Sequence, residues 1–329
     1  MLQNRVMSSF LKWLGLDIDP NSLNYFPLKG GGSEATLFSF NIGQNAYVLR
    51  LLPEQADRPT RKHQIALAIQ AGKIGVGPEV YFVDNQLQGM VMQFIPGTTV
   101  KSADFEHSDQ LGQFAKLLQK LHRSNEKFPI AISPFQRFNR FIRKGKESKI
   151  TYPSKFDDVK NLMNELEATL KLIPISQTPT HLDLHPLNIM QLHDSYLLVD
   201  WVNGGMCDPY FDLATFATFQ CLNESKTHLF LTHYFERPPT SSELDRYIIT
   251  QPIRLFVAAA ALLNTSPDST RLLSYNEALT ALILPSMREF SIIEKSVPLW
   301  QFGLTLLISG LELADHKNFK QALHIFKSI

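Results

Sequence analysis

The feature that most constrains the fold is a change in hydrophobic periodicity close to residue 97. Before it, apolar and polar residues alternate in short runs, as at 36–40 and 46–52 on either side of a turn at 43–45. This alternation predicts half-buried β-strands. After it, apolar residues recur every three or four positions, which predicts helices. A strand-rich part followed by a helix-rich part indicates an α+β fold with two lobes.

The boundary between the lobes is expected at Pro96-Gly97, because this pair stops a predicted strand. It divides the 329 residues into a small β-rich lobe, 1–97, and a large, mostly helical lobe, 98–329. In the first lobe the pattern also predicts helices over 1–19 and 61–72 and strands over 79–84 and 90–95. In the second it predicts helices beginning at Ser108 and at Asp157 or Asp158, and others over 210–235, 243–264, 275–295 and 298–327.

Charge and composition exclude several classes of protein. The chain has 32 Lys and Arg against 31 Asp and Glu, so no overall field attracts it to nucleic acid or to an anionic membrane. Cys207 and Cys221 are too few for a disulfide scaffold. The longest apolar run, 255–263, is shorter than the ~20 residues that span a bilayer. We therefore expect a cytoplasmic protein with no nucleic-acid partner and no membrane span, whose oligomeric state the sequence leaves unknown.

Side chains suited to chemistry gather between residues 181 and 200. Pro179 and Pro186 exclude a regular helix around His181–Asn188, which is therefore expected to be a constrained loop. Short strands at 189–192 and 196–199 follow it and are expected to pair as a hairpin.

The hairpin is expected to bring Asn188 and Asp200 together, since Cβ atoms across an antiparallel pair lie ~5 Å apart. Amide and carboxylate oxygens are ligands that suit Mg²⁺. Asp183 precedes Asn188 on the same loop and can take a proton from a hydroxyl. A carboxylate base, an asparagine and a metal-binding aspartate in this order are the parts that phosphoryl transfer needs.

A glycine-rich turn in the first lobe offers a second half for such a site. Glycines let backbone N–H groups approach phosphate oxygens, although three glycines in a hairpin are also an ordinary turn. Arg50 lies within a later, otherwise apolar strand, where a buried cation is costly unless it is paired, and a triphosphate would pair it. An arginine at a sheet edge whose charged end reaches solvent is the alternative. The turn consists of Gly30, Gly31, Gly32 and Ser33.

Three motifs in order carry a family resemblance. His181-x-Asp183-x-x-x-x-Asn188 is followed by Asp200-Trp201 and then by Asp208-Pro209-x-x-Asp212-Leu213-Ala214. This arrangement resembles the aminoglycoside phosphotransferase and choline kinase family, which has a protein-kinase-like fold. The resemblance covers roughly residues 25–220.

The resemblance implies a role for each matching residue. Asp183 would be the catalytic base or would orient the acceptor hydroxyl, and Asn188 and Asp200 would hold Mg²⁺. Asp212 would brace the catalytic loop by accepting its backbone N–H groups, and we expect His181 to be a buried group that braces the same loop. ATP would be bound by the remaining matches, which are Gly30, Gly31, Gly32 and Ser33 over the phosphates, Arg50 as the strand cation, and the hinge from Gln93 to Ile95 at the adenine.

Three positions depart from the family pattern. Gln64 stands where a glutamate usually pairs with the strand cation. Leu187 replaces a common glycine of the loop. Val202 stands two residues after Asp200, where choline kinases typically carry a glutamate, so it disfavours a choline-type pocket.

Two other functional interpretations remain open. His181, Asp183, His185 and His193 could form a metal-hydrolase cluster, but the prolines exclude the helix that usually presents paired zinc-binding histidines. A basic run at 137–149, interleaved with apolar residues, is typical of a solvated amphipathic helix. A surface that recruits an anionic substrate or RNA is the alternative.

The sequence therefore predicts an ATP- and Mg²⁺-dependent kinase that phosphorylates a small alcohol. Choline, ethanolamine or a similar amino alcohol is the first candidate acceptor, and an aminoglycoside or other sugar-like alcohol is the second. A nucleotide-binding pseudokinase that acts through a partner is the alternative, supported by Gln64 and Leu187.

Overall fold

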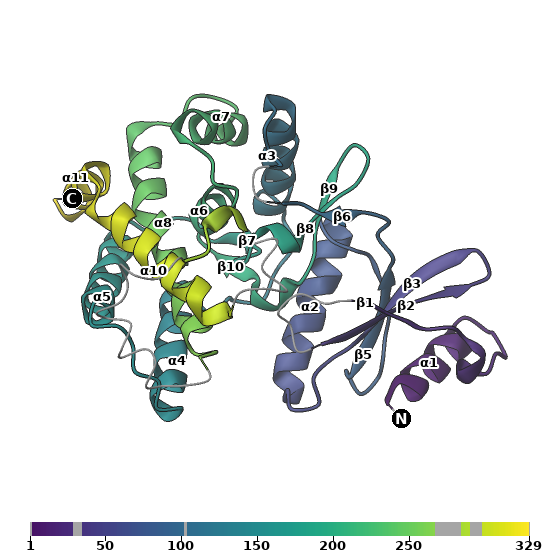
Figure 1. Ribbon diagram of the computed structural model, residues 1–329. Helices are drawn as coiled ribbons and strands as arrows, with labels where there is room; N and C mark the ends of the chain where they lie inside the picture. Colours follow the sequence, from purple (N-terminus) through teal and green to yellow (C-terminus); the bar gives the residue numbers. More distant parts are fainter. Residues whose placement is uncertain (1, 29–34, 102–103, 267–283, 290–297, 329) are drawn as a thin grey trace.

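The N-terminal part is built on a five-stranded antiparallel sheet in the order β1-β2-β3-β5-β4 (Figure 1). The computed structural model describes residues 2–28, 35–101, 104–266, 284–289 and 298–328. The period-two runs form adjacent central strands, with Leu37 of β2 and Met90 of β5 opposite Arg50 of β3. The strands are β1 (Phe26–Leu28), β2 (Thr36–Ile42), β3 (Asn45–Leu51), β4 (Val80–Val83) and β5 (Gly89–Gln93).

Helix α1 (Leu2–Trp13) packs on this sheet through the apolar stripe expected from the sequence. Val6 and Phe10 are fully buried in a cluster with residues of β2, β3 and β5. Leu14, the last member of the predicted stripe, lies beyond the end of the helix and is exposed. The predicted helix over 1–19 is therefore correct in position but too long.

Helix α2 (Arg58–Ile74) starts earlier than the predicted 61–72. The Asp57 carboxylate accepts the Thr60 backbone N–H and caps the helix, and Pro59 is tolerated in the first turn, where no helical N–H is needed. Gly75 ends the helix with φ of 70°, a left-handed conformation that glycine adopts at low cost. The N-terminal boundary was missed because the apolar periodicity begins only inside the helix.

Two small sheets connect the N-terminal sheet to the helices (Figure 1). The predicted hairpin is present as β8 (Ile189–Gln191) and β9 (Tyr196–Leu198), and β6 (Thr98–Thr99) pairs with β8. The pairing of β7 (Thr178–Thr180) with β10 (Gly205–Cys207) was not expected from the sequence. Because β6 already belongs to the hairpin's sheet, the connection at 94–97 is where we would place the division between the lobes.

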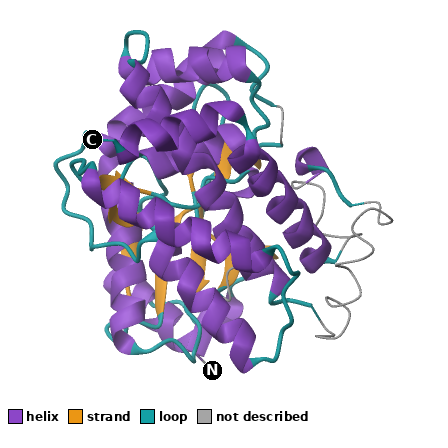
Figure 2. Ribbon diagram, turned by 90° about the vertical axis from the view of Figure 1, so that its left-hand side faces the viewer, coloured by secondary structure: helices purple, strands orange, loops and turns teal. Residues whose placement is uncertain are grey.

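The C-terminal part is mostly helical, which confirms the predicted α+β class. Figure 2 shows its helices in front of the strands. Helix α3 begins at Ser108, as predicted, and His107 is its N-cap. The stretches 210–235 and 298–327 are each divided into two helices. Most of the predicted helix over 275–295 lies outside the described residues. The helices are α3 (Ser108–His122), α4 (Pro134–Glu147), α5 (Phe156–Leu172), α6 (Tyr210–Phe219), α7 (Glu224–Phe235), α8 (Ser241–Leu263), α10 (Leu299–Asp315) and α11 (Lys317–Lys327).

Helix α8 is the centre of the helical core. Among the described residues it alone has the length and hydropathy of a candidate membrane span, and 72% of its apolar window is buried inside the protein. It contacts α4, α6, α10 and α11. Burial by neighbouring helices accounts for its apolar character.

Candidate active site

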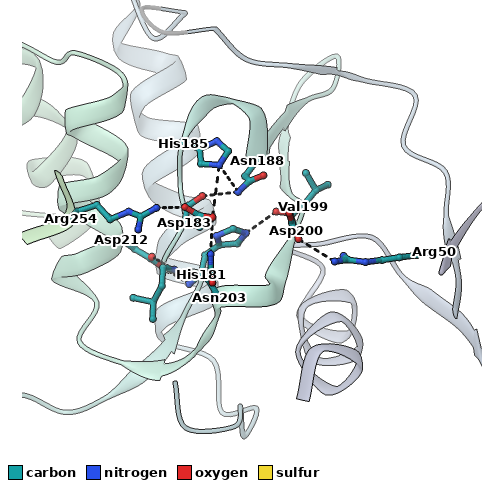
Figure 3. A network of polar contacts seen from close by, with 11 residues as sticks. Arg50, His181, Asp183, His185, Asn188, Val199, Asp200, Asn203, Asp212 and Arg254 are labelled. Carbon is teal, nitrogen blue, oxygen red and sulfur yellow. Dashed lines mark hydrogen bonds and ion pairs between the residues drawn. The ribbon is translucent and has the colours of Figure 1, made fainter. Parts of the chain in front are cut away.

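The loop that carries Asp183 is hydrogen-bonded through its backbone to Asp212, which lies on the first turn of α6 (Figure 3). The fully buried Asp212 carboxylate accepts the backbone N–H groups of His181 and Leu182, both at 2.7 Å. It also contacts His122 Nε2 of α3 at 3.1 Å. Leu182 has φ of 61°, which is costly for a residue with a Cβ, so the bonds to Asp212 maintain a strained turn.

The His181 side chain joins this loop to the end of β9. Its Nε2 donates to the Val199 backbone oxygen at 2.8 Å, and its ring packs edge-on against Trp201 with centroids 4.6 Å apart. His181 is fully buried. Its contacts are those of a structural group that fixes Asp183 relative to Asp200.

Asn188 ends a short 3₁₀ helix, Pro186–Asn188, and is nearly buried. Its Nδ2 donates to the Asp183 backbone oxygen at 2.9 Å and to His185 Nε2 at 3.1 Å. Since Nε2 accepts there, the proton of a neutral His185 ring is on Nδ1. Burial lowers the pKa of His185 and opposes the nearby Asp183 charge, which raises it. With Nδ2 engaged, the Asn188 amide oxygen is the atom suited to bind a cation.

Asp200 reaches the same cavity as Asn188 by a route that differs from the predicted one. Ile189 pairs with Leu198, and the Val199 backbone N–H donates to the Asn188 backbone oxygen at 3.0 Å. Asn188 therefore lies opposite Val199 and not opposite Asp200. Asp200 is one residue further along and has a left-handed backbone, with φ of 59°. This turn interrupts the alternation of strand side chains, and Asp200 lines the cavity together with Asn188.

A cavity of about 370 Å³ lies between the N-terminal sheet and the hairpin. It brings together five of the predicted site residues, Arg50, Gln93, Ile95, Asn188 and Asp200. Asp183 is not among its lining residues, and the predicted phosphate loop, Gly30 to Ser33, lies outside the described residues. The apolar walls come from both parts of the chain and include Leu37, Val48, Ala68, Met92, Leu187 and Met190.

Two of the cavity residues are already partly engaged. The Gln93 backbone N–H donates to the Glu79 backbone oxygen at 2.8 Å, so a nucleotide cannot use that donor. Arg50 is 7% exposed, and its Nη2 lies 3.2 Å from Asp200 Oδ1. No hydrogen bond among the described residues joins Arg50 to Gln64, so the strand cation is held by Asp200 and not by α2.

The donor set in the cavity fits a magnesium ion. Asn188 and Asp200 offer an amide oxygen and a carboxylate, and Mg²⁺ is usually held by one or two such ligands together with phosphates and water. The described residues contain no cluster of three or more His, Cys, Asp or Glu side chains that could hold a metal alone. His193 is 94% exposed at the hairpin tip, so the metal-hydrolase interpretation is not supported.

Asp183 is surrounded by residues that the sequence reasoning missed (Figure 3). Its Oδ1 accepts a hydrogen bond from Arg254 Nη2 of α8, and its Oδ2 accepts one from Asn203 Nδ2 at 2.9 Å. Burial alone would raise the pKa of Asp183, but the positive charge of Arg254, with those of neighbouring groups, lowers it to about 2. Asp183 is therefore a carboxylate at neutral pH.

Most of the basic run at 137–149 lies in helix α4, and one of its residues belongs to this site. Arg137 is buried, and its Nη2 donates to the Asn203 backbone oxygen at 3.0 Å. The other basic residues, Arg140, Arg143, Lys144, Lys146 and Lys149, are exposed, as expected for a solvated face. Helical spacing could have found Arg137, since it lies three residues after Pro134 on the apolar face.

Comparisons with known proteins identify the family of the chain. The phosphotransferase enzyme family (APH) matches residues 27–240. Protein LicA of Haemophilus influenzae is 24% identical over 209 residues, which cover 62% of this chain; the match spans only 61% of the length of LicA.

Solved structures with a similar fold include two kinds of kinase. A choline/ethanolamine kinase family protein from Mesorhizobium loti has a TM-score of 0.72 at 18% identity, over 98% of this chain and 100% of that one. The ADP-bound aminoglycoside phosphotransferase APH(2'')-Ib has a TM-score of 0.58 at 13% identity, over 83% of this chain and 95% of that one. Both confirm the expected kinase-like fold.

Proposed function

Since the chain belongs to the phosphotransferase enzyme family, we propose that it is a small-molecule kinase that transfers the γ-phosphate of ATP to an alcohol. One observation carries this proposal. Asn188 and Asp200 line one cavity with Arg50, and the Asn188 side chain is bonded to the backbone of Asp183. The residues assigned to the nucleotide and the metal ion are thus next to a carboxylate, Asp183, that can accept a hydrogen bond from the acceptor hydroxyl.

In the proposed reaction the acceptor hydroxyl lies against Asp183, which orients it and accepts its proton. The hydroxyl oxygen forms a bond to the γ-phosphorus, and the bond from that phosphorus to the β,γ-bridging oxygen breaks. The electron pair stays with ADP, and the proton later passes to water. Fixed geometry and charge supply most of the rate in such transfers, which is why the bracing of the loop by Asp212 and His181 matters.

The nucleotide and its metal ion are assigned to the cavity. Arg50 would offset phosphate charge, and the backbone near Ile95 would bind adenine against the apolar walls. Asn188 and Asp200 would hold Mg²⁺, which neutralises phosphate charge when it is bound. The ADP-bound neighbour supports the use of a nucleotide. ATP supply is consistent with a cytoplasmic location, which we retain as part of the proposal.

Choline, ethanolamine and similar amino alcohols are the acceptors that the resemblance favours, followed by aminoglycosides. The names of the Mesorhizobium protein and of APH(2'')-Ib support these two classes of acceptor. All of these acceptors are cations. Val202 and the arginines around Asp183 do not favour a cation.

A nucleotide-binding pseudokinase is the second candidate. It is favoured by one observation, that both key carboxylates are held by arginines, Asp200 by Arg50 and Asp183 by Arg254. The Arg50–Asp200 pair does not exclude catalysis, because phosphates can replace Asp200 as a partner of Arg50.

The test is ADP formation by the purified full chain with ATP, Mg²⁺ and a panel of small alcohols. We expect at least one alcohol to stimulate ADP formation well above the rate with water alone. Nucleotide binding that requires Mg²⁺, without stimulation by any alcohol, would favour the pseudokinase instead.

A further inference from the structure

Two helices each bring a buried arginine to the catalytic loop. Arg137 of α4 and Arg254 of α8 are both 9% exposed, and these helices pack against each other. Arg254 donates to one oxygen of Asp183, and Arg137 is connected to the other oxygen through Asn203, whose backbone and side chain bond to Arg137 and Asp183 respectively. Figure 3 shows Arg254 on the far side of Asp183 from Asn188 and Asp200.

This cluster holds more positive than negative charge. Asp183 balances one guanidinium, and Arg137 is bonded only to a neutral carbonyl among the described residues. Burial, and next the charge of Arg254, lowers the pKa of Arg137 to about 10, as expected for two cations confined together. Arg254 Nε is also buried without a hydrogen-bond partner in the described part of the chain. A buried arginine with an unused donor is costly unless something binds it.

The carboxylates nearby do not supply the missing charge. Asp208 Oδ2 accepts a hydrogen bond from Arg246 Nε of α8 at 3.0 Å. Asp212 is engaged by the loop N–H groups and His122. Asp200 is paired with Arg50. Asp208 and Asp200 are thus paired with other arginines, and Asp212 makes no hydrogen bond or ion pair with Arg137 or Arg254 in the described part of the chain. Among the described residues, these two arginines therefore have only Asp183 as a carboxylate partner between them.

We propose that the acceptor alcohol carries an oxyanion, a carboxylate or a phosphate ester, and that Arg254 and Arg137 bind this group beside Asp183. The inference rests on the proposed kinase function and names the chemical class of its acceptor. Guanidinium groups bind such oxyanions with paired, charge-assisted hydrogen bonds. A choline-type or aminoglycoside acceptor would instead place its cation next to two buried cations.

The Arg254–Asp183 ion pair also gives the acceptor's anion a role in the reaction. Without acceptor, Arg254 occupies the Asp183 oxygen that a hydroxyl needs. When the acceptor's oxyanion takes Arg254 as its partner, that oxygen is released to receive the hydroxyl proton. Asn203 keeps the other oxygen in place. The anion is therefore expected to improve both the binding and the alignment of the acceptor.

The test compares alcohols that share a carbon skeleton and differ in charge. One set is glycerol, glycerate, glycerol phosphate and serinol; the other is glucose, glucuronate, glucose 6-phosphate and glucosamine, with choline and ethanolamine added. Thermal shift and ADP formation are measured on the full chain with Mg²⁺ and nucleotide. We expect each acid to give a larger thermal shift than its neutral match and a kcat/KM at least about tenfold higher. Comparison of the carboxylates with the phosphate esters then identifies which oxyanion the site prefers. Acids that are no better than their neutral matches, or amines that exceed them, would overturn the inference.

Arginine variants connect that preference to the proposed residues. In Arg254→Gln and Arg137→Gln, the ratio of kcat/KM for the acid to that for its neutral match should fall at least about tenfold, and Arg254→Lys should recover part of it. A merely structural role would lower activity on both alcohols and leave the ratio unchanged. Arg143→Gln, an exposed arginine on α4, is the matched control. If Arg254→Gln does not fold, Arg137→Gln and Arg254→Lys carry the test.

The outcomes separate this inference from the proposed function. Turnover that prefers amines leaves the kinase standing and removes the anionic acceptor. If no alcohol stimulates ADP formation while an acid still shifts the melting temperature through Arg254, the anion site stands and catalysis fails. Absence of both effects removes both proposals.

Discussion

Arg50 and Asp200 lie 150 residues apart in the chain and form an ion pair, with Nη2 and Oδ1 separated by 3.2 Å. Arg50 comes from a central strand of the N-terminal sheet, and Asp200 comes from the turn after β9. The pair therefore joins the two parts of the molecule across the cavity. Gln64 on α2, where a glutamate was expected, is not needed to hold the strand cation.

Replacing Asp200 tests the metal and nucleotide assignment. Asp200→Ala should weaken ATP binding about 10- to 100-fold in the presence of Mg²⁺ and have little effect on nucleotide binding without it, because the carboxylate acts through the metal. It should also lower the free energy of unfolding by about 1–3 kcal/mol, since Arg50 loses its partner. Titration calorimetry with and without Mg²⁺ checks the first effect, and urea denaturation checks the second.

The matched control is Asp194→Ala, which removes an exposed carboxylate at the tip of the same hairpin. It should leave nucleotide affinity and stability unchanged. Equal losses in the two variants would show that the hairpin, and not the Asp200 carboxylate, is what the nucleotide requires.

Asp183→Asn separates catalysis from nucleotide binding. We expect turnover to fall by about 10²–10⁴-fold, because an amide cannot take the hydroxyl proton. The affinity for ATP should stay within about twofold, because Asp183 does not line the nucleotide cavity. Initial rates of ADP formation and calorimetry measure the two quantities. Retained activity would assign the base to another residue.

The part of the site that could be predicted from the sequence is the part set by local spacing. Prolines, loop length and the hairpin were enough to associate Asp183, Asn188 and Asp200, whereas the role of Asp212 was implied only by the family resemblance. The left-handed turn at Asp200 could not be read, because its backbone is fixed by packing around Trp201 and not by the residue itself.

The arginines of the site were missed for different reasons. Arg254 reaches Asp183 across 71 residues, and nothing in local spacing predicts such a contact. Its signal is a charge directly before the longest apolar run, 255–263, on a buried part of α8, where it is costly unless it is paired. Arg137 was hidden among five exposed basic residues and could have been separated from them by its position on the helix face.

The bracing role of Asp212 predicts a large effect on stability. In Asp212→Asn one of the two oxygens becomes an NH2 group, which would face the loop N–H of either His181 or Leu182, so the strained turn at Leu182 would lose one of its two supports. We expect the free energy of unfolding to fall by about 3 kcal/mol. Urea denaturation measures it, with the exposed Asp158→Asn of α5 as the control. Equal stability of the two variants would remove the bracing role.

The Asp183–Arg254 pair predicts how stability depends on pH. The pKa of Asp183 is about 2 in the folded protein, against an ordinary value of 3.8. A carboxyl group whose pKa is lowered by folding stabilises the protein above its unfolded value and loses this contribution as the pH falls through the folded value. The difference corresponds to about 2 kcal/mol.

We therefore expect the stability advantage of the wild type over Asp183→Asn to be constant from pH 7 to 5 and to shrink by about that amount between pH 4 and 2. Glu243→Gln serves as the control, because Glu243 also has a pKa of about 2 but is held by Arg237 away from the site. The losses of stability caused by Asp183→Asn and by Glu243→Gln should therefore add in the double variant. An advantage that stays constant down to pH 2 would mean that Asp183 is not stabilised as a carboxylate by Arg254.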